Sequence, residues 1–208
     1  FNSNLYPLMY INIMYNIKSS DSEIQKAIML LSNGKAKESL DLVNKIIKSS
    51  PSQAILFNIS GACNNALGKK KEAIKCYEEA LFIDPNYAEA HNNIGNTYKE
   101  NGQFKKAFNS YKTALLLKPS FSEAHNNLGN FFKEEGKTNE AIDSYLKAIK
   151  YNLNYIEAFN NLGIALTDLG NLKSSVDAYM RVLKLDPNIA EAHYNLGVTF
   201  QRHGEINS

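Results

Sequence analysis

The chain has 208 residues, of which 44% are hydrophobic and 21% charged, a composition that favours a protein with a buried core and excludes an intrinsically disordered one. Its 23 basic and 21 acidic residues nearly balance, so the net charge of +2 excludes the strongly basic surface typical of nucleic-acid or anionic-membrane binding. Two cysteines are too few for a zinc site, and no apolar run reaches the roughly 18 residues that a membrane span requires. We therefore expect a cytoplasmic protein that holds no metal or cofactor and binds neither nucleic acid nor membrane.

Residues 1–19 precede the regular part of the sequence and form a segment of their own. The stretch after Pro7 is too apolar for a free tail, with Leu8, Met9, Ile11, Ile13, Met14 and Ile17. We expect a short helix here that caps the array of repeats that follows, because the ends of such arrays need covering. The alternative is a tail that docks in a groove of this chain or of a neighbouring one.

From residue 20 onward, the sequence repeats with a period of 34 residues. Two series of glycines and one series of prolines keep this step. The first series is Gly34, Gly68, Gly102, Gly136, Gly170 and Gly204; the second is Gly61, Gly95, Gly129, Gly163 and Gly197; the prolines are Pro51, Pro85, Pro119 and Pro187, with Leu153 where a fifth is due. A constant period of this length indicates a stack of similar supersecondary units.

Each series has a physical role in a unit of two helices. The first glycines follow amphipathic runs such as 88–101, and the end of a helix favours a residue that tolerates left-handed dihedrals. The second glycines fall within the same helices, where glycine costs about 1 kcal/mol relative to alanine, so their recurrence predicts the close approach of a neighbouring helix. Small residues one helix later are expected to pack against them: Ala73, Ala107, Ala141, Ala80, Ala114 and Ala148. The prolines end the second helix.

A glutamate also recurs near the start of each unit, three residues after an asparagine or serine. The pairs are Asn86 with Glu89, Ser120 with Glu123, Asn154 with Glu157, and Asn188 with Glu191. This is the spacing of a capping box at a helix start. Evenly spaced carboxylates also suit acid–base chemistry, but packed helices stand about 8–10 Å apart, so we favour capping.

The pattern resembles the tetratricopeptide repeat, a helix-turn-helix unit of 34 residues. The best copy carries the family's positions as His91, Ile94, Gly95, Tyr98, Ala107, Tyr111, Ala114 and Pro119. The resemblance implies an all-α fold, a right-handed superhelical solenoid of such repeats over residues 20–208. The repeats are expected at 20–53, 54–87, 88–121, 122–155 and 156–189, with a partial repeat at 190–208. His91, His125 and His193 share one packing position, and we expect packing rather than metal ligation there because the repeats hold them too far apart for one ion.

The partial repeat at 190–208 ends where its second helix should begin. Leu196 and Phe200 would then lack the helix that covers these positions in the other repeats. This predicts either a chain cut within a repeat or an exposed apolar strip that another molecule covers, including self-association through this C-terminal helix.

In the tetratricopeptide repeat family, the second, fifth, sixth, ninth and twelfth positions tend to face the concave groove, and three of these columns are rich in asparagine here. The sixth column is Asn93, Asn127, Asn161 and Asn195; the fifth is Asn92, Asn126, Asn160 and Tyr194; the ninth contributes Asn96 and Asn130. A carboxamide can donate to a peptide carbonyl and accept from a peptide N–H, so it recognises backbone without regard to side chain. Asparagines about 10 Å apart would meet every third residue of an extended ligand. These columns therefore predict a peptide-binding site.

The same columns resemble the asparagine ladder of O-linked N-acetylglucosamine transferases, through the phrases Asn93-Ile94-Gly95-Asn96 and Asn127-Leu128-Gly129-Asn130. We expect a non-enzymatic scaffold that binds a protein or peptide partner in extended conformation. The alternative is the substrate-recognition arm of a larger glycosyltransferase of that type, whose catalytic domain is absent from this chain. A third reading is a structural unit that assembles with itself. Duplicated repeats copy every residue together, so the recurrence of asparagine also agrees with plain duplication.

Overall fold

A computed structural model of the chain describes residues 22–49 and 51–206, which form eleven α-helices and, within those ranges, no strand. The helices are α1 (Ser22–Ser32), α2 (Ala36–Ser49), α3 (Ala54–Ala66), α4 (Lys70–Ile83), α5 (Ala88–Glu100), α6 (Phe104–Leu117), α7 (Ser122–Glu134), α8 (Thr138–Tyr151), α9 (Ile156–Asp168), α10 (Leu172–Leu185) and α11 (Ala190–Ile206). The predicted all-α fold of helix-turn-helix repeats is confirmed. The predicted cap at 1–19 lies outside the described residues.

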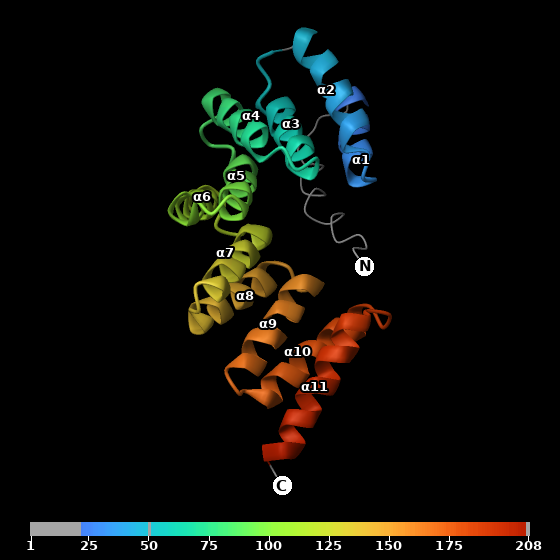
Figure 1. Ribbon diagram of the computed structural model, residues 1–208, viewed down its shortest axis with the longest axis vertical. Helices are drawn as coiled ribbons and strands as arrows, with labels where there is room; N and C mark the ends of the chain where they lie inside the picture. Colours follow the sequence, from blue (N-terminus) through green and yellow to red (C-terminus); the bar gives the residue numbers. More distant parts are fainter. Residues whose placement is uncertain (1–21, 50, 207–208) are drawn as a thin grey trace. The chain divides into compact units, whose positions relative to one another are not determined.

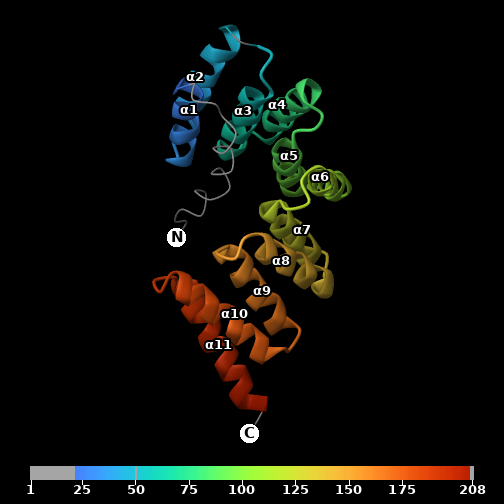
Figure 2. The same cartoon turned by 180° about the vertical axis from the view of Figure 1, so that it is seen from behind.

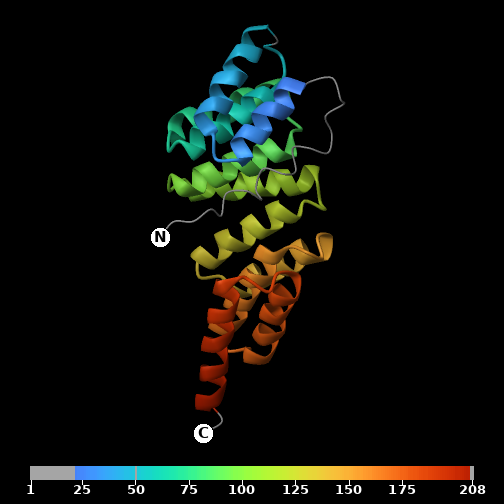
Figure 3. The same ribbon diagram turned by 90° about the vertical axis from the view of Figure 1, so that its right-hand side faces the viewer.

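The helices are grouped in two compact units, and the boundary in the sequence falls between Lys118 and Pro119. Unit 1 contains α1 to α6, coloured blue to green in Figure 1, and unit 2 contains α7 to α11, coloured olive to red. Within each unit every helix packs on the next one along the chain, as Figure 2 shows from behind. In unit 2, α11 also packs on both α9 and α10, and Figure 3 shows these three helices together. The helices that open repeats, α3, α5, α7, α9 and α11, begin at residues 54, 88, 122, 156 and 190.

The first glycine series ends the first helix of each pair, as predicted. Five of its members have positive φ between 72° and 81°: Gly34, Gly68, Gly102, Gly136 and Gly170. This region favours glycine because a side chain would clash with the backbone. The prediction for Gly204 is wrong, because α11 continues through this residue to Ile206.

Four glycines of the second series lie under a tyrosine ring of the following helix, so the predicted close approach is confirmed for them. The prediction for Gly197 is wrong, because no described atom lies within 4 Å of a Cβ added there. A Cβ atom added at Gly129 would lie 2.5 Å from Cε1 of Tyr145. The same contact recurs in three further pairs: Gly61 with Tyr77, Gly95 with Tyr111, and Gly163 with Tyr179. The nearest neighbour is therefore the aromatic ring, whereas the alanines expected to fill this role are buried elsewhere in the same helices.

The predicted capping boxes do not form, so that prediction is wrong. The helices begin one residue later than the boxes require, and the N-cap residues of the three helices described at this point are Tyr87, Phe121 and Tyr155, none of which caps its helix through its side chain. The turns before the helices are held by a different bond, in which a side-chain oxygen accepts from the backbone N–H two residues on. The pairs are Asp84 with Asn86 at 3.0 Å, Asn152 with Asn154 at 3.1 Å, and Asp186 with Asn188 at 2.9 Å. These are Asx turns.

The core lies between neighbouring helices of each unit. In unit 1, Ile24, Val43 and Leu56 belong to one buried cluster contributed by α1, α2 and α3. Cys63 is buried in the same cluster, and burial raises the pKa of its thiol to about 11, so it stays protonated at neutral pH. In unit 2, Tyr145 of α8 packs with residues of α9 and α10.

Candidate peptide-binding site

The candidate asparagines lie on the first helix of four successive repeats. In unit 1, α5 carries Asn92, Asn93 and Asn96; in unit 2, α7 carries Asn126, Asn127 and Asn130, α9 carries Asn160 and Asn161, and α11 carries Tyr194 and Asn195. Their exposure differs widely. Tyr194 is 72% exposed, whereas Asn126 is 0% exposed. Contrary to the expectation from the sequence, the Asn126 side chain therefore does not face a groove.

Asn126 is held by the next repeat of unit 2. Its Nδ2 donates to Oε1 of Glu157 at 2.9 Å. Because a carboxylate only accepts hydrogen bonds, this contact fixes which end of the amide faces Glu157. The oxygen of Asn126 accepts from Nδ2 of Asn161 at 3.1 Å. The buried asparagine thus links a glutamate of the next repeat to the asparagine at that repeat's sixth position.

Asn161 makes a second donation with the same nitrogen. Its Nδ2 also lies 3.1 Å from Oδ1 of Asn130, and that oxygen accepts the hydroxyl proton of Tyr145 at 2.8 Å. A carboxamide nitrogen has two hydrogens, so both donors of Asn161 are engaged. Its carbonyl oxygen has no partner in the described part of the chain. Asn161 is half-buried and offers an acceptor.

The same polarity recurs one repeat later in unit 2. Asn160 donates to Oε1 of Glu191 at 3.0 Å, which again fixes its amide. Its oxygen accepts from Nδ2 of Asn195 at 3.5 Å, a longer and weaker contact. The oxygen of Asn195, like that of Asn161, is unpartnered within residues 22–49 and 51–206.

Unit 1 contains a related pair. Nδ2 of Asn93 donates to Oδ1 of Asn58 at 3.1 Å, and Nδ2 of Asn58 donates to the hydroxyl of Tyr87 at 3.3 Å. In each case a sixth-position asparagine donates to the fifth-position asparagine of the preceding repeat. The asparagines predicted to bind a peptide therefore form hydrogen bonds with one another.

Three candidates have other surroundings. Oδ1 of Asn96 accepts the hydroxyl proton of Tyr111 at 2.6 Å, and its buried Nδ2 has no hydrogen-bond partner among the described residues. Asn92 and Asn127 are both buried and have interactions of their own.

Sequence reasoning missed part of this network. Asn58 falls one period before Asn92, so extending the fifth column backwards would have found it. The local spacing of Glu157 and Glu191 favours helix caps, and their pairing with asparagines of the preceding repeat leaves no signal in that spacing.

No three His, Cys, Asp or Glu side chains gather to form a metal-binding cluster within the described ranges. His91, His125 and His193 each place Nε2 within 2.9–3.0 Å of a proline carbonyl. Burial lowers the pKa of His125, so its ring is neutral at pH 7. Among the described helices, none is long and apolar enough to cross a membrane.

Comparison with known proteins agrees with a fold of repeated helix pairs. Residues 65–102, 95–134, 129–170 and 163–204 match the sequence profile of the TPR repeat. The chain belongs to the tetratricopeptide repeat (TPR) family. No curated protein matches it.

Solved structures share the TPR fold over most of their lengths. A thermophilic TPR protein of Thermus thermophilus is similar with a TM-score of 0.75 and 16% identity, covering 87% of this chain and 98% of that one. MamA is similar with a TM-score of 0.64 and 20% identity, covering 79% and 96%. YrrB, a TPR protein with an unusual peptide-binding site, has a TM-score of 0.62 and 25% identity, covering 78% and 84%. The first two likenesses show the fold alone.

Proposed function

We propose that this TPR chain is a non-enzymatic scaffold that binds an extended polypeptide partner by its backbone. The observation that carries the proposal is the polarity of the asparagine network. Both donor hydrogens of the Asn161 amide are engaged by acceptors within unit 2, and its carbonyl oxygen stays available. A peptide N–H is the backbone group that such an oxygen accepts.

The network also prepares these acceptors before any ligand arrives. The carboxylate of Glu157 orients Asn126, which in turn orients Asn161. A group held in its binding orientation loses less conformational entropy on binding. In unit 2 we assign peptide contact to the sixth-position asparagines Asn161 and Asn195 and to the exposed Tyr194, and in unit 1 to Asn93. The remaining candidates support them: Asn92, Asn96, Asn126, Asn127, Asn130 and Asn160. The peptide-binding site of YrrB supports this use of the fold.

Removing two acceptors tests the site. We expect Asn161→Ala together with Asn195→Ala to weaken binding to an unstructured peptide library about tenfold, because each lost hydrogen bond contributes about 0.5–1.5 kcal/mol. Fluorescence anisotropy measures the affinity. Asn139→Ala, an exposed asparagine of α8, is the matched control and should bind as the parent does. Unchanged affinity in the double variant, with an unchanged melting curve, would remove the proposal.

A modified ligand tests the acceptor role separately. We expect the bound peptide to lose affinity when its backbone nitrogens are N-methylated at every third residue, because methylation removes the N–H that the asparagine oxygen accepts. Methylation in each of the three registers identifies which nitrogens matter. Equal binding of all methylated forms contradicts backbone recognition by acceptors.

The glutamate behind the network offers a further prediction. Glu157→Ala leaves Nδ2 of the buried Asn126 without the acceptor that it has in the native chain. We expect a loss of about 1–3 kcal/mol in the free energy of unfolding, the cost of an unsatisfied buried polar group. Urea denaturation measures it, and peptide affinity should fall with it. Glu157→Gln retains an acceptor oxygen and should lose less of both; equal losses would contradict the orienting role.

The same asparagines support a second candidate, the substrate-recognition arm of a larger glycosyltransferase. In that role the scaffold would present extended substrate segments to a catalytic domain on the same polypeptide. Sequencing the complete gene separates the candidates, because the second requires a nucleotide-sugar-binding domain after these repeats.

Location and self-association complete the proposal. We place the scaffold in the cytoplasm, where reducing conditions keep thiols such as Cys63 and Cys76 free. Cell fractionation tests this location. Phe200 of α11 is 55% exposed, and we propose that two copies associate through this helix. Light scattering over a concentration series should show an association that Phe200→Glu abolishes.

A further inference from the structure

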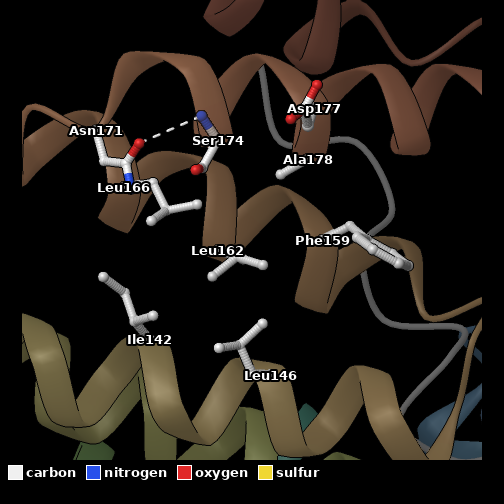
Figure 4. A pocket seen from close by; sticks show the side chains of 9 residues that line it. All are labelled: Ile142, Leu146, Phe159, Leu162, Leu166, Asn171, Ser174, Asp177 and Ala178. Atoms are coloured by element: carbon white, nitrogen blue, oxygen red, sulfur yellow. Dashed lines mark hydrogen bonds between the residues drawn. The ribbon is translucent and has the colours of Figure 1, made fainter.

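Unit 2 contains an apolar groove that the asparagine network does not use. Ile142 and Leu146 of α8 form one wall, and Leu162 and Leu166 of α9 form the floor, as Figure 4 shows. The cavity measures about 470 Å³, within the range of about 300–1,000 Å³ that ligand pockets occupy.

Comparison between repeats explains why the groove exists. At the equivalent place in unit 1, the hydroxyl of Tyr98 donates to Glu78 at 3.0 Å, and Nζ of Lys106 lies 5.1 Å from the centre of the Tyr98 ring. The contacts among these three side chains close the space that corresponds to the groove. Two periods later the same positions are Leu166, Leu146 and Ser174. Leu166 is smaller than Tyr98 and Ser174 is smaller than Lys106, and none of the three side chains in unit 2 can form these contacts. The space between α8 and α10 therefore stays open.

The groove is open rather than enclosed. Leu146 is 49% exposed although it lines the cavity, whereas Leu162 and Leu166 below it are buried. A half-exposed leucine at the rim costs hydrophobic free energy that a covering apolar group recovers. An open slot of this kind suits side chains that project from another protein.

The opposite wall is mostly polar and is formed by α10 and its N-cap residue Asn171. It carries Asn171, Ser174, Asp177 and Ala178, and Oδ1 of Asn171 accepts from the backbone N–H of Ser174 at 3.3 Å. Asp177 is exposed and is the charged residue of the lining. It forms no ion pair with any residue that the structure describes. The groove thus pairs an apolar floor with one available carboxylate.

We propose that this groove binds an amphipathic helix of a partner protein, which presents aliphatic side chains to Leu146, Leu162 and Leu166 and a lysine or arginine to Asp177. The walls are two helices that both pack on α9, and an amphipathic helix is an element that lays its apolar face into a hydrophobic groove of this kind. Apolar residues spaced three and four apart on one face of the partner would enter the slot together. The carboxylate selects a basic partner over an acidic one. This site is separate from the asparagines of the proposed function.

The chain contains no tryptophan, which makes the probe specific. The probes are two designed amphipathic peptides with one tryptophan each, identical except that lysine in the first is replaced by glutamate in the second. We expect the emission of the leucine–lysine peptide to shift to shorter wavelength on titration with the full chain, and its affinity to exceed that of the leucine–glutamate peptide about fivefold. No shift, or equal affinity for both peptides, overturns the proposal.

Variants locate the binding. Leu146→Glu and Leu166→Tyr introduce the residues found at the equivalent positions of unit 1, and each should weaken the leucine–lysine peptide about tenfold. Leu116→Glu makes the same change at an 81% exposed leucine of α6, outside the groove, and should have no effect. Asp177→Asn should remove the preference for lysine, because it removes both the attraction to the lysine peptide and the repulsion of the glutamate peptide. Equal affinities of Leu146→Glu and Leu116→Glu, both folded by circular dichroism, overturn the assignment. Asn161→Ala with Asn195→Ala should leave this binding intact, so the two proposals fail independently.

Discussion

Tyr145 fills the space that a side chain at Gly129 would need, and its hydroxyl reaches Asn130. One tyrosine therefore joins the packing of two helices to the hydrogen-bond network of the candidate site. Tyr111 stands in the same relation to Gly95 and Asn96 in unit 1. The mid-helix glycine weakens its own helix by about 1 kcal/mol relative to alanine, and the buried ring offsets this cost.

Two mid-helix glycines of unit 2, Gly129 and Gly197, give a matched prediction at this scale. Gly129→Ala places Cβ 2.5 Å from the Tyr145 ring, so we expect a loss of about 1–3 kcal/mol in the free energy of unfolding. Gly197→Ala meets no described atom within 4 Å and should stabilise α11 by up to about 1 kcal/mol. Urea denaturation measures both. Equal effects of the two substitutions would contradict the packing role of Tyr145.

At the scale of the element, the start of each first helix depends on the turn before it. Oδ1 of Asp84 accepts from the backbone N–H of Asn86, and α5 then begins at Ala88. Glu89 bonds instead to Lys118, whose Nζ lies 2.7 Å from its Oε1. The side chain that organises the helix start is thus the aspartate before the proline, outside the helix.

This reassignment can be tested in α5. Asp84→Ala removes the Asx-turn acceptor, and we expect a loss of about 0.5–1.5 kcal/mol in the free energy of unfolding. Asn86→Ala keeps the backbone donor and should change stability little. Thermal denaturation of the two variants decides between the Asx turn and the capping box, because the box predicts the larger loss at Asn86.

At the scale of the whole molecule, buried tyrosines link folding to alkaline pH in both units. Burial raises the pKa of Tyr98 in unit 1 from 10.0 to about 12. Burial likewise raises the pKa of Tyr87 in unit 1 and of Tyr145 and Tyr155 in unit 2. The folded chain therefore holds these protons more tightly than the unfolded chain does.

The sign of the effect follows from that difference. The stabilisation is fully present below pH 10, where the unfolded tyrosines are protonated, and it is lost as the pH rises from 10 towards 12. We expect the melting temperature to fall steeply over this interval. Tyr98→Phe, compared with the parent at each pH, should show a shallower fall. A melting temperature that stays constant to pH 12 would contradict the burial argument.

The period of 34, the paired helices and their turns were predictable from the sequence because each rests on local backbone chemistry. A residue such as Gly102, with φ of 72°, is required wherever the repeat needs that turn. The close contact at four of the five glycines of the second series was predictable for a related reason. Glycine weakens a helix, so its recurrence inside one indicates the close approach of a neighbouring side chain. Asparagine columns were likewise visible in the sequence, and they located the candidate site on the first helices.

The polarity of the asparagines was not visible there. Asn126 is identical in type to Asn161, yet one is buried against Glu157 and the other keeps a carbonyl oxygen available. Such partners lie about 31 to 35 residues apart, and only packing between repeats brings them together. The groove beside Leu146 depends on the same kind of contact, because its volume is set by what side chains of three helices leave unfilled. Local propensity determines the repeat. The packing of one repeat on the next determines which of its polar groups are hydrogen-bonded inside the protein and which stay available to a ligand.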